Sequence, residues 1–113
     1  MADDCLFCRI VRGEIPAKLV FEDEHCIAFR DINPQAPTHV LVVPREHVES
    51  LDRTRDSVLV GQLLLAAGAI ARQEDVAQAG YRTVINTNRA AGQTVFHLHV
   101  HLLGGRPLEW PPG

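Results

Sequence analysis

Residues 96–103, Phe-His-Leu-His-Val-His-Leu-Leu, alternate between apolar and imidazole side chains. Strict alternation is typical of a half-buried β-strand, because successive side chains point to opposite faces of a sheet. We therefore predict a strand over residues 95–103 in which Leu98, Val100 and Leu102 face a core. The three imidazoles would then align on the other face. Such a row is suited to metal binding or to proton and phosphoryl chemistry, although a merely polar strand face is the simpler alternative.

A turn of small residues, Ala90-Ala91-Gly92, leads directly into this strand and is followed by Gln93 and Thr94. Exposed backbone N–H groups beside an amide and a hydroxyl suit an anion such as a phosphate. The sequence therefore predicts that Gly92, Gln93 and Thr94 donate hydrogen bonds to a phosphate next to the histidines.

The bulk properties limit the class of protein. At 113 residues the chain has room for one core, so we expect a single domain over residues 1–113. A net charge of −3 gives no reason to expect binding to nucleic acid or to a membrane surface. The sequence contains no long apolar run and no signal-peptide core, so we expect a cytoplasmic protein. Three cysteines in that reducing compartment argue against a disulfide framework.

The remaining pattern predicts an α+β fold. A short helix over residues 5–12 would be capped by Asp3 or Asp4, with Leu6 and Ile10 packed inward. Two of the strand connections are short, which favours antiparallel pairing. We therefore expect a five-stranded, mainly antiparallel sheet, with the helices on one side. The expected strands cover residues 19–22, 26–31, 39–44, 81–86 and 95–103, and a long helix covers residues 56–78, ending before Gly80.

The long helix is apolar over most of its circumference. In a chain this small, such a helix needs a second surface to cover it, and a second copy of the protein is one such surface. The alternative is a helix sunk in its own core. We therefore predict a homodimer.

The segment from Gly92 to Arg106 resembles the signature of the histidine triad (HIT) superfamily, His-φ-His-φ-His-φ-φ with φ apolar. The pair Gly104-Gly105 and the ending Trp110-Pro-Pro-Gly113 resemble its Hint branch, the histidine triad nucleotide-binding proteins. The resemblance covers nearly the whole chain. It implies the HIT fold, dimers formed through the long helix and the fourth strand, and a role for Trp110 near the partner's active site.

A neutral imidazole is a good nucleophile at pH 7 and a tolerable leaving group, which suits transfer of a nucleotidyl group to water. The middle histidine, His99, is our candidate nucleophile, because a backbone carbonyl can hold its Nδ1–H and leave Nε2 free. The resemblance implies the same role and a covalent nucleotidyl-histidine. The other expected catalytic residues are His97, His101, His39 and Thr94.

The resemblance also implies a nucleotide site in which Asp31 holds the ribose and Asn86 lies beside the phosphate. Asp31 has a second interpretation as a turn cap before Asn33-Pro34, and the apolar members of the set have one as plain core. The expected nucleotide-binding residues are Asp31, Ile32, Asn86, Gly92, Gln93, Thr94, His99, His101, Phe7, Ile10 and Ile15.

A Cys-x-x-Cys pair, Cys5 and Cys8, departs from the animal-type Hint pattern. Some bacterial HIT proteins and the related galactose-1-phosphate uridylyltransferases bind zinc through two such cysteines and two histidines, here matched by His47 and His97. Cys₂His₂ is a good tetrahedral zinc set, and a closed four-ligand site is structural. Two cysteines on one helical turn are also compatible with plain core packing. Catalysis would require no cofactor.

The resemblance implies a hydrolase that cleaves the P–N bond of adenosine or guanosine 5′-phosphoramidates or related acyl-nucleotides. A dinucleoside polyphosphate hydrolase shares residues 92–95 and the triad, whereas the Gly-Gly pair and the Trp-Pro-Pro-Gly ending favour the Hint branch. A non-catalytic nucleotide-binding or scaffold protein would better fit an altered His99. A metal carrier would leave the phosphate-binding elements unexplained.

Overall fold

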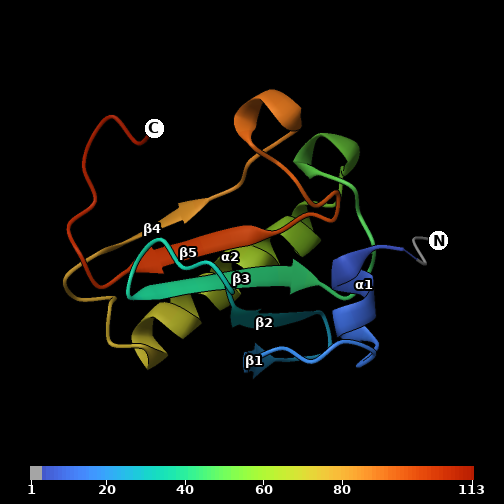
Figure 1. Cartoon of the computed structure of the whole chain (residues 1–113), viewed down its shortest axis with the longest axis horizontal. Helices are drawn as coiled ribbons and strands as arrows, with labels where there is room; N and C mark the ends of the chain where they lie inside the picture. The colour runs from blue at the N-terminus through green and yellow to red at the C-terminus, as the bar shows by residue number, and fades with distance from the viewer. Residues whose placement is uncertain (1–3) are drawn as a thin grey trace.

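The computed structural model describes residues 4–113, which form one five-stranded sheet with helices packed on it (Figure 1). The strand order is β1-β2-β3-β5-β4, and every neighbouring pair is antiparallel. This confirms the predicted α+β fold. In chain order the elements are α1 (Leu6–Val11), β1 (Leu19–Glu22), β2 (Cys26–Arg30), β3 (Thr38–Pro44), η1 (Leu51–Arg53), α2 (Ser57–Gln73), β4 (Tyr81–Val84), η2 (Arg89–Ala91) and β5 (Val100–Gly104).

The two α-helices cover opposite faces of the sheet, so the expectation that they share one side is wrong. Helix α2 runs behind the sheet in Figure 1 and packs on Val40, Val42 and their neighbours. Phe7 of α1 packs with Leu41 and Val43, which point the other way from the same strand. Strand β3 is therefore buried along its whole length, as its continuous apolar run predicts.

Strand β5 is shorter than predicted. It begins at Val100, because the chain bends over residues 95–97 before it joins the sheet. The predicted alternation nevertheless holds for the apolar side chains: Leu98, Val100 and Leu102 all lie in the core beneath α2. At the other end of the strand a Cβ on Gly104 would lie 2.9 Å from the Cβ of Val76, so this close approach requires glycine.

Both helix predictions need correction at their ends. Helix α2 stops at Gln73 rather than near residue 78, because Asp75 takes a left-handed backbone conformation with φ of 60°. Helix α1 is capped by the Cys5 thiol rather than by Asp4, and the other predicted cap, Asp3, lies outside the described residues. Leu6 is 44% exposed and does not pack inward as predicted.

Part of the apolar surface of α2 is exposed. Leu65 is 76% and Val58 is 67% exposed on the side of α2 that the sheet does not cover. Strand β4 forms one edge of the sheet, with Tyr81 partly exposed. None of the helices in the described part of the chain is long and apolar enough to cross a membrane.

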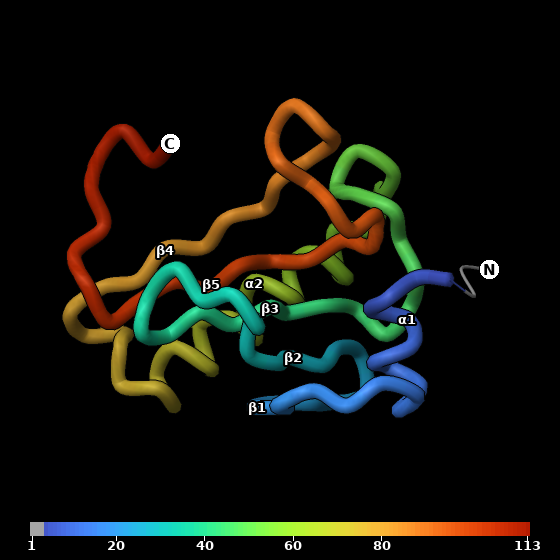
Figure 2. The backbone as a smooth tube through the Cα atoms, viewed as in Figure 1, coloured from blue at the N-terminus to red at the C-terminus, as the bar shows by residue number. Residues whose placement is uncertain are grey.

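Two loops meet near the end of the sheet at which β5 begins. The segment that carries η2 lies against the segment that follows β3 (Figure 2), and the Gln93 side chain donates a hydrogen bond to the Glu49 carbonyl at 2.8 Å. The first of these segments leads into β5. The loops therefore bring residues 88–99 close to the end of β3.

Candidate active site

A cavity of about 1080 Å³ opens on the sheet face that carries α1. Side chains from α1, β2 and β3 give it an apolar wall, and the histidine segment gives it a polar one. Most of the predicted nucleotide-binding and catalytic residues line it. These are Phe7, Ile10, Ile15, Asp31, Ile32, His39, Asn86, Gly92, Thr94, His99 and His101.

His99 is held as a nucleophile needs to be held. Its Nδ1 lies 2.7 Å from the carbonyl oxygen of His97. A carbonyl only accepts hydrogen bonds, so Nδ1 carries the proton and the lone pair of the neutral ring is at Nε2. The ring of Phe7 packs edge-on against the His99 imidazole, with centroids 5.1 Å apart. Backbone and side chain together fix both the tautomer and the plane of the ring.

His101 is the end of a chain of hydrogen bonds that starts at the backbone. The Gln35 N–H donates to His39 Nδ1 at 3.0 Å, so His39 carries its proton at Nε2. That Nε2–H donates to His101 Nδ1 at 2.9 Å, and the Asp31 carboxylate lies 3.4 Å from the same nitrogen of His39. His101 is therefore left with its own proton at Nε2, the nitrogen available to the cavity.

Burial keeps these imidazoles neutral. Desolvation lowers the pKa of His101 to about 4, and the neighbouring His99 and His39 act in the same direction. Desolvation also lowers the pKa values of His39 and His99, against the opposing effects of Asp31 and, for His99, of the His97 carbonyl. Near neutral pH His99 is therefore uncharged, the form in which an imidazole attacks phosphorus.

Asp31 caps a turn and also lines the cavity. Its Oδ1 accepts the Asn33 N–H at 2.8 Å, which makes it the turn cap that the sequence admits. Its Oδ2 lies toward His39. One carboxylate thus closes a turn and also presents an acceptor to the cavity.

The Gln93 side chain, predicted to donate to a phosphate, is bonded to the protein's own backbone. The side chain is 3% exposed and does not line the cavity. Its amide donates to the carbonyls of Glu49 and Val95, at 2.8 and 3.2 Å, and accepts the Asn88 N–H at 2.8 Å. All three bonds are to backbone, so Gln93 braces the loop that carries the neighbouring Thr94.

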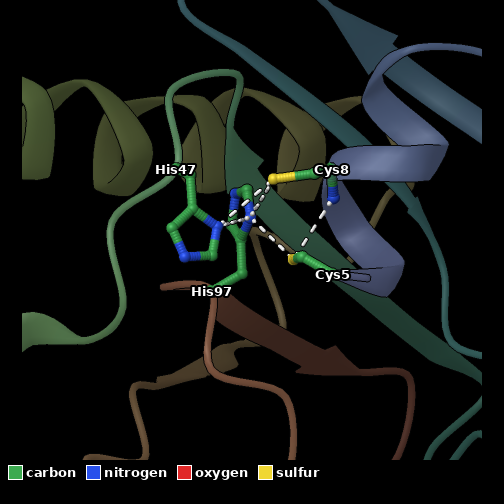
Figure 3. Close-up of side chains that lie close together, drawn as sticks. All are labelled: Cys5, Cys8, His47 and His97. Atoms are coloured by element: carbon green, nitrogen blue, oxygen red, sulfur yellow. Dashed lines mark hydrogen bonds between the residues drawn. The ribbon is translucent and has the colours of Figure 1, made fainter. Parts of the chain in front are cut away.

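The His97 side chain lies outside the cavity and is fully buried. The bend before β5 turns its imidazole toward α1 instead of along the strand face, so of the two roles predicted for His97 its position fits that of a metal ligand. Its Nε2–H donates to the Pro44 carbonyl at 2.8 Å, which leaves the Nδ1 lone pair facing Cys5 and Cys8 (Figure 3). Burial lowers the pKa of His97 to about 4.

The structure brings together the four predicted metal ligands, Cys5, Cys8, His47 and His97 (Figure 3). Three different segments of the chain supply them: α1, the loop after β3, and the bend before β5. Their ligand atoms lie within 4.8 Å of one another. Burial raises the pKa of the Cys8 thiol to about 11, so without a cation this thiol is protonated near neutral pH.

The donor set fits a tetrahedral zinc ion. Zinc–sulfur bonds of about 2.3 Å and zinc–nitrogen bonds of about 2.0–2.1 Å place two tetrahedral ligand atoms about 3.3–3.6 Å apart when at least one is nitrogen, and about 3.8 Å apart when both are sulfur. The measured separations are 3.4 and 3.5 Å from His97 Nδ1 to the thiols of Cys5 and Cys8. His47 Nδ1 lies 3.2 Å from both Cys8 Sγ and His97 Nδ1. The carbonyl that holds His97 Nε2–H is the outer partner expected of a metal-binding histidine.

Several site residues were not predicted from the sequence. Phe29 and Leu41 line the cavity, and strand parity could have found them, because they share the face of the sheet that carries α1. Gln35 fixes the His39 tautomer through its backbone N–H, and Val48 accepts the Leu98 N–H at 2.6 Å. Contacts made by backbone atoms do not depend on the type of side chain, so the amino-acid sequence gives no sign of them.

Known proteins are similar to this chain in sequence and in fold. The model of the HIT domain family matches residues 12–108. An uncharacterized HIT-like protein of Synechococcus elongatus is 56% identical over the full length of both chains. Purine nucleoside phosphoramidase of Escherichia coli is 46% identical over 96% of this chain and 92% of that one. A HIT family hydrolase of Legionella pneumophila matches with a TM-score of 0.94 and 50% identity, over 96% of this chain and 99% of that one. Since the agreement extends over nearly the whole chain in both sequence and fold, the chain belongs to the HIT family.

Proposed function

We propose that this protein is a hydrolase that cleaves the P–N bond of purine nucleoside 5′-phosphoramidates. The observation that carries the proposal is the 2.7 Å hydrogen bond from His99 Nδ1–H to the His97 carbonyl, which leaves Nε2 as the attacking atom in the cavity. The relative from Escherichia coli that is 46% identical is named a purine nucleoside phosphoramidase, which supports the substrate class.

Different regions of the cavity suit the base, the ribose and the phosphate of a nucleotide. Phe7, Ile10 and Phe29 offer an apolar surface to a flat base. Asp31 offers its carboxylate to the ribose hydroxyls. The phosphate would then lie between Thr94 and His99.

In the proposed reaction the lone pair of His99 Nε2 attacks the α-phosphorus. The N–P bond to His99 forms as the P–N bond to the leaving group breaks, and the departing amine takes up one proton. His101 Nε2–H is the donor positioned at the cavity for the leaving group. Water then attacks phosphorus, releases the nucleoside monophosphate and His99, and gives back one proton. Related acyl-nucleotides would react by the same steps.

The first test is amine release from adenosine 5′-phosphoramidate by the wild type, His99→Ala and His25→Ala. We expect His99→Ala to lower kcat by about 1000-fold or more while AMP still binds. His25 lies on an exposed turn away from the cavity, so His25→Ala should match the wild type. Equal turnover by His99→Ala would remove His99 from the mechanism.

The same assay separates the alternative functions. If the wild type binds AMP without releasing amine, a dinucleoside polyphosphate replaces the phosphoramidate as the substrate to test. If neither compound turns over while AMP binds, the protein is a nucleotide-binding or scaffold protein.

We also propose that Cys5, Cys8, His47 and His97 hold a structural zinc ion in the chain, which a reducing cytoplasm would permit because it keeps both thiols reduced. The support is the agreement of the ligand separations with tetrahedral geometry. A closed site of this kind supplies rigidity, and the reaction steps above use only side chains of the cavity.

A homodimer is the proposed assembly. It would cover Leu65 and Val58 of α2 and pair the exposed edge of β4. Trp110, which is 82% exposed, would then lie near the partner's cavity. Light scattering should give twice the chain mass, and Leu65→Glu should reduce it to the monomer. A wild-type monomer would overturn this assembly.

A further inference from the structure

We propose that a metal ion at Cys5, Cys8, His47 and His97 and a nucleotide in the cavity bind cooperatively, so that the metal cluster sets the affinity of the active site. This inference rests on the proposed nucleotide function and the proposed metal site. The geometry points to it because two short segments of the chain, α1 and the bend before β5, each carry residues of both sites.

The first connection runs through the backbone of His97. The imidazole of His97 belongs to the metal cluster, and its Nε2–H is anchored on the Pro44 carbonyl. The carbonyl of the same residue accepts the Nδ1–H of His99. A ligand that fixes the His97 side chain thereby fixes the peptide group that orients His99.

The second connection runs through the side chain of Phe7. Phe7 lies between Cys5 and Cys8 in the sequence, on the single helical turn that presents both thiols. Its ring packs on the imidazoles of both His97 and His99, with centroid distances of 5.9 and 5.1 Å. Moving the thiols therefore moves the residue that forms the cavity wall against His99.

Helix α1 cannot hold this position through its own hydrogen bonds. It has six residues, whereas isolated helices shorter than about 12–15 residues are marginal in water. Its place on the sheet therefore depends on tertiary contacts. These contacts include the packing of Phe7 against Phe29 and Leu41 and the contacts of the two thiols with the cluster histidines.

Coupling of this kind is reciprocal: metal tightens nucleotide binding by the same factor by which nucleotide tightens metal binding. Calorimetric titration with AMP should show about tenfold weaker binding after zinc is removed with a chelator, within the usual range of such coupling. Cys5→Ser/Cys8→Ser, measured in zinc, should show the same loss. Cys26→Ala is the matched control, because Cys26 is buried in the other core, beneath α2.

The reciprocal measurement uses Co²⁺, whose visible absorption reports a tetrahedral thiolate site. Saturating AMP should tighten Co²⁺ binding to the wild type by about the same tenfold factor. A metal that merely keeps the chain folded would also pass this test, so a third variant is needed. In Phe7→Leu the effect of zinc on the AMP affinity should shrink, because one of the two connections is cut.

The outcomes are distinct. Equal AMP affinity with and without zinc overturns the coupling and leaves the proposed nucleotide function intact. An undiminished zinc effect in Phe7→Leu overturns the connection through Phe7 and assigns the coupling to the His97 backbone. Failure of every form to bind AMP removes the nucleotide function itself, and failure to bind zinc or Co²⁺ removes the metal site.

Discussion

His99 has a polar cluster on each side, and the two clusters differ in how their polar atoms are satisfied. In the first, His97 Nδ1 faces two thiols and a second imidazole nitrogen, all at 3.2–3.5 Å. In the second, His39, His101 and Asp31 also lie within metal-binding distance of one another. There, however, a backbone N–H starts a directional series of hydrogen bonds that ends at the cavity.

The difference shows that proximity of ligand atoms does not define a metal site. In the first cluster several ligand atoms converge on one point. Because the Pro44 carbonyl accepts the Nε2–H of His97, the lone pair on His97 Nδ1 is available to a cation. In the second cluster each Nδ1 of His39 and His101 receives a hydrogen bond, so the series ends in an N–H at His101 Nε2. That N–H has a proton to donate. We infer that the first cluster binds metal and that the second handles protons, and each of the following predictions bears on this division.

The largest expected effect is on metal content. The wild type and His39→Asn should each retain about one zinc ion per chain after dialysis, whereas Cys8→Ser should retain almost none. Atomic emission measures the metal, and Cys26→Ala controls for loss of a buried thiol. Loss of zinc in His39→Asn with retention in Cys8→Ser would reverse the two assignments.

The next effect is on the chemical step. His101→Asn should lower kcat with the phosphoramidate on the order of 100-fold, since a positioned acid–base group contributes 10²–10⁴. His39→Asn should cost less, because His39 acts through His101. Both variants should keep their zinc. An unchanged kcat in His101→Asn would mean that the second cluster does not supply the leaving-group proton.

Side-chain pattern was enough to predict most of the fold. Alternation placed Leu98, Val100 and Leu102 in the core, and the nearly continuous apolar run within residues 39–44 located the central strand. It could not place the bend before β5, because the alternation continues through it. The cause of that bend is long-range: the Leu98 N–H donates to the carbonyl of Val48, about fifty positions earlier in the chain.

The same limit applies to the site. The resemblance to the HIT family brought the cavity residues together by position. Gln93, however, was predicted to donate to a phosphate, and His97 was predicted to be both a catalytic residue and a metal ligand. Both side chains lie outside the cavity and donate hydrogen bonds to backbone carbonyls, Gln93 to Glu49 and His97 to Pro44. Whether an amide or imidazole faces a ligand or a buried carbonyl depends on tertiary contacts, which local sequence does not encode.

Gln93 belongs to neither cluster and therefore measures what a loosened loop alone does to activity. Gln93→Leu removes three partly buried hydrogen bonds, to the carbonyls of Glu49 and Val95 and to the Asn88 N–H. The expected cost is about 1–3 kcal/mol in the free energy of unfolding. We expect roughly tenfold lower kcat/KM and unchanged zinc content. Gln78→Leu, at an exposed position, is the control. If Gln93→Leu lowered kcat as much as His101→Asn does, disorder of the site would explain the loss in His101→Asn, and no lost proton donor would be needed.

The smallest effect is on acid stability, and it isolates the proton-handling cluster. Burial lowers the pKa of His101 to about 4 from its ordinary value of 6.5, so between these pH values the unfolded chain binds more protons than the folded one. Its contribution to the free energy of unfolding is therefore complete above about pH 6.5 and is lost as the pH falls toward 4. Urea denaturation in chelator, which excludes metal loss, should give a shallower pH dependence for His101→Asn than for the wild type. Equal slopes would mean that His101 already carries its charge in the folded state, and the neutral hydrogen-bonded series from Gln35 to the cavity would then be wrong.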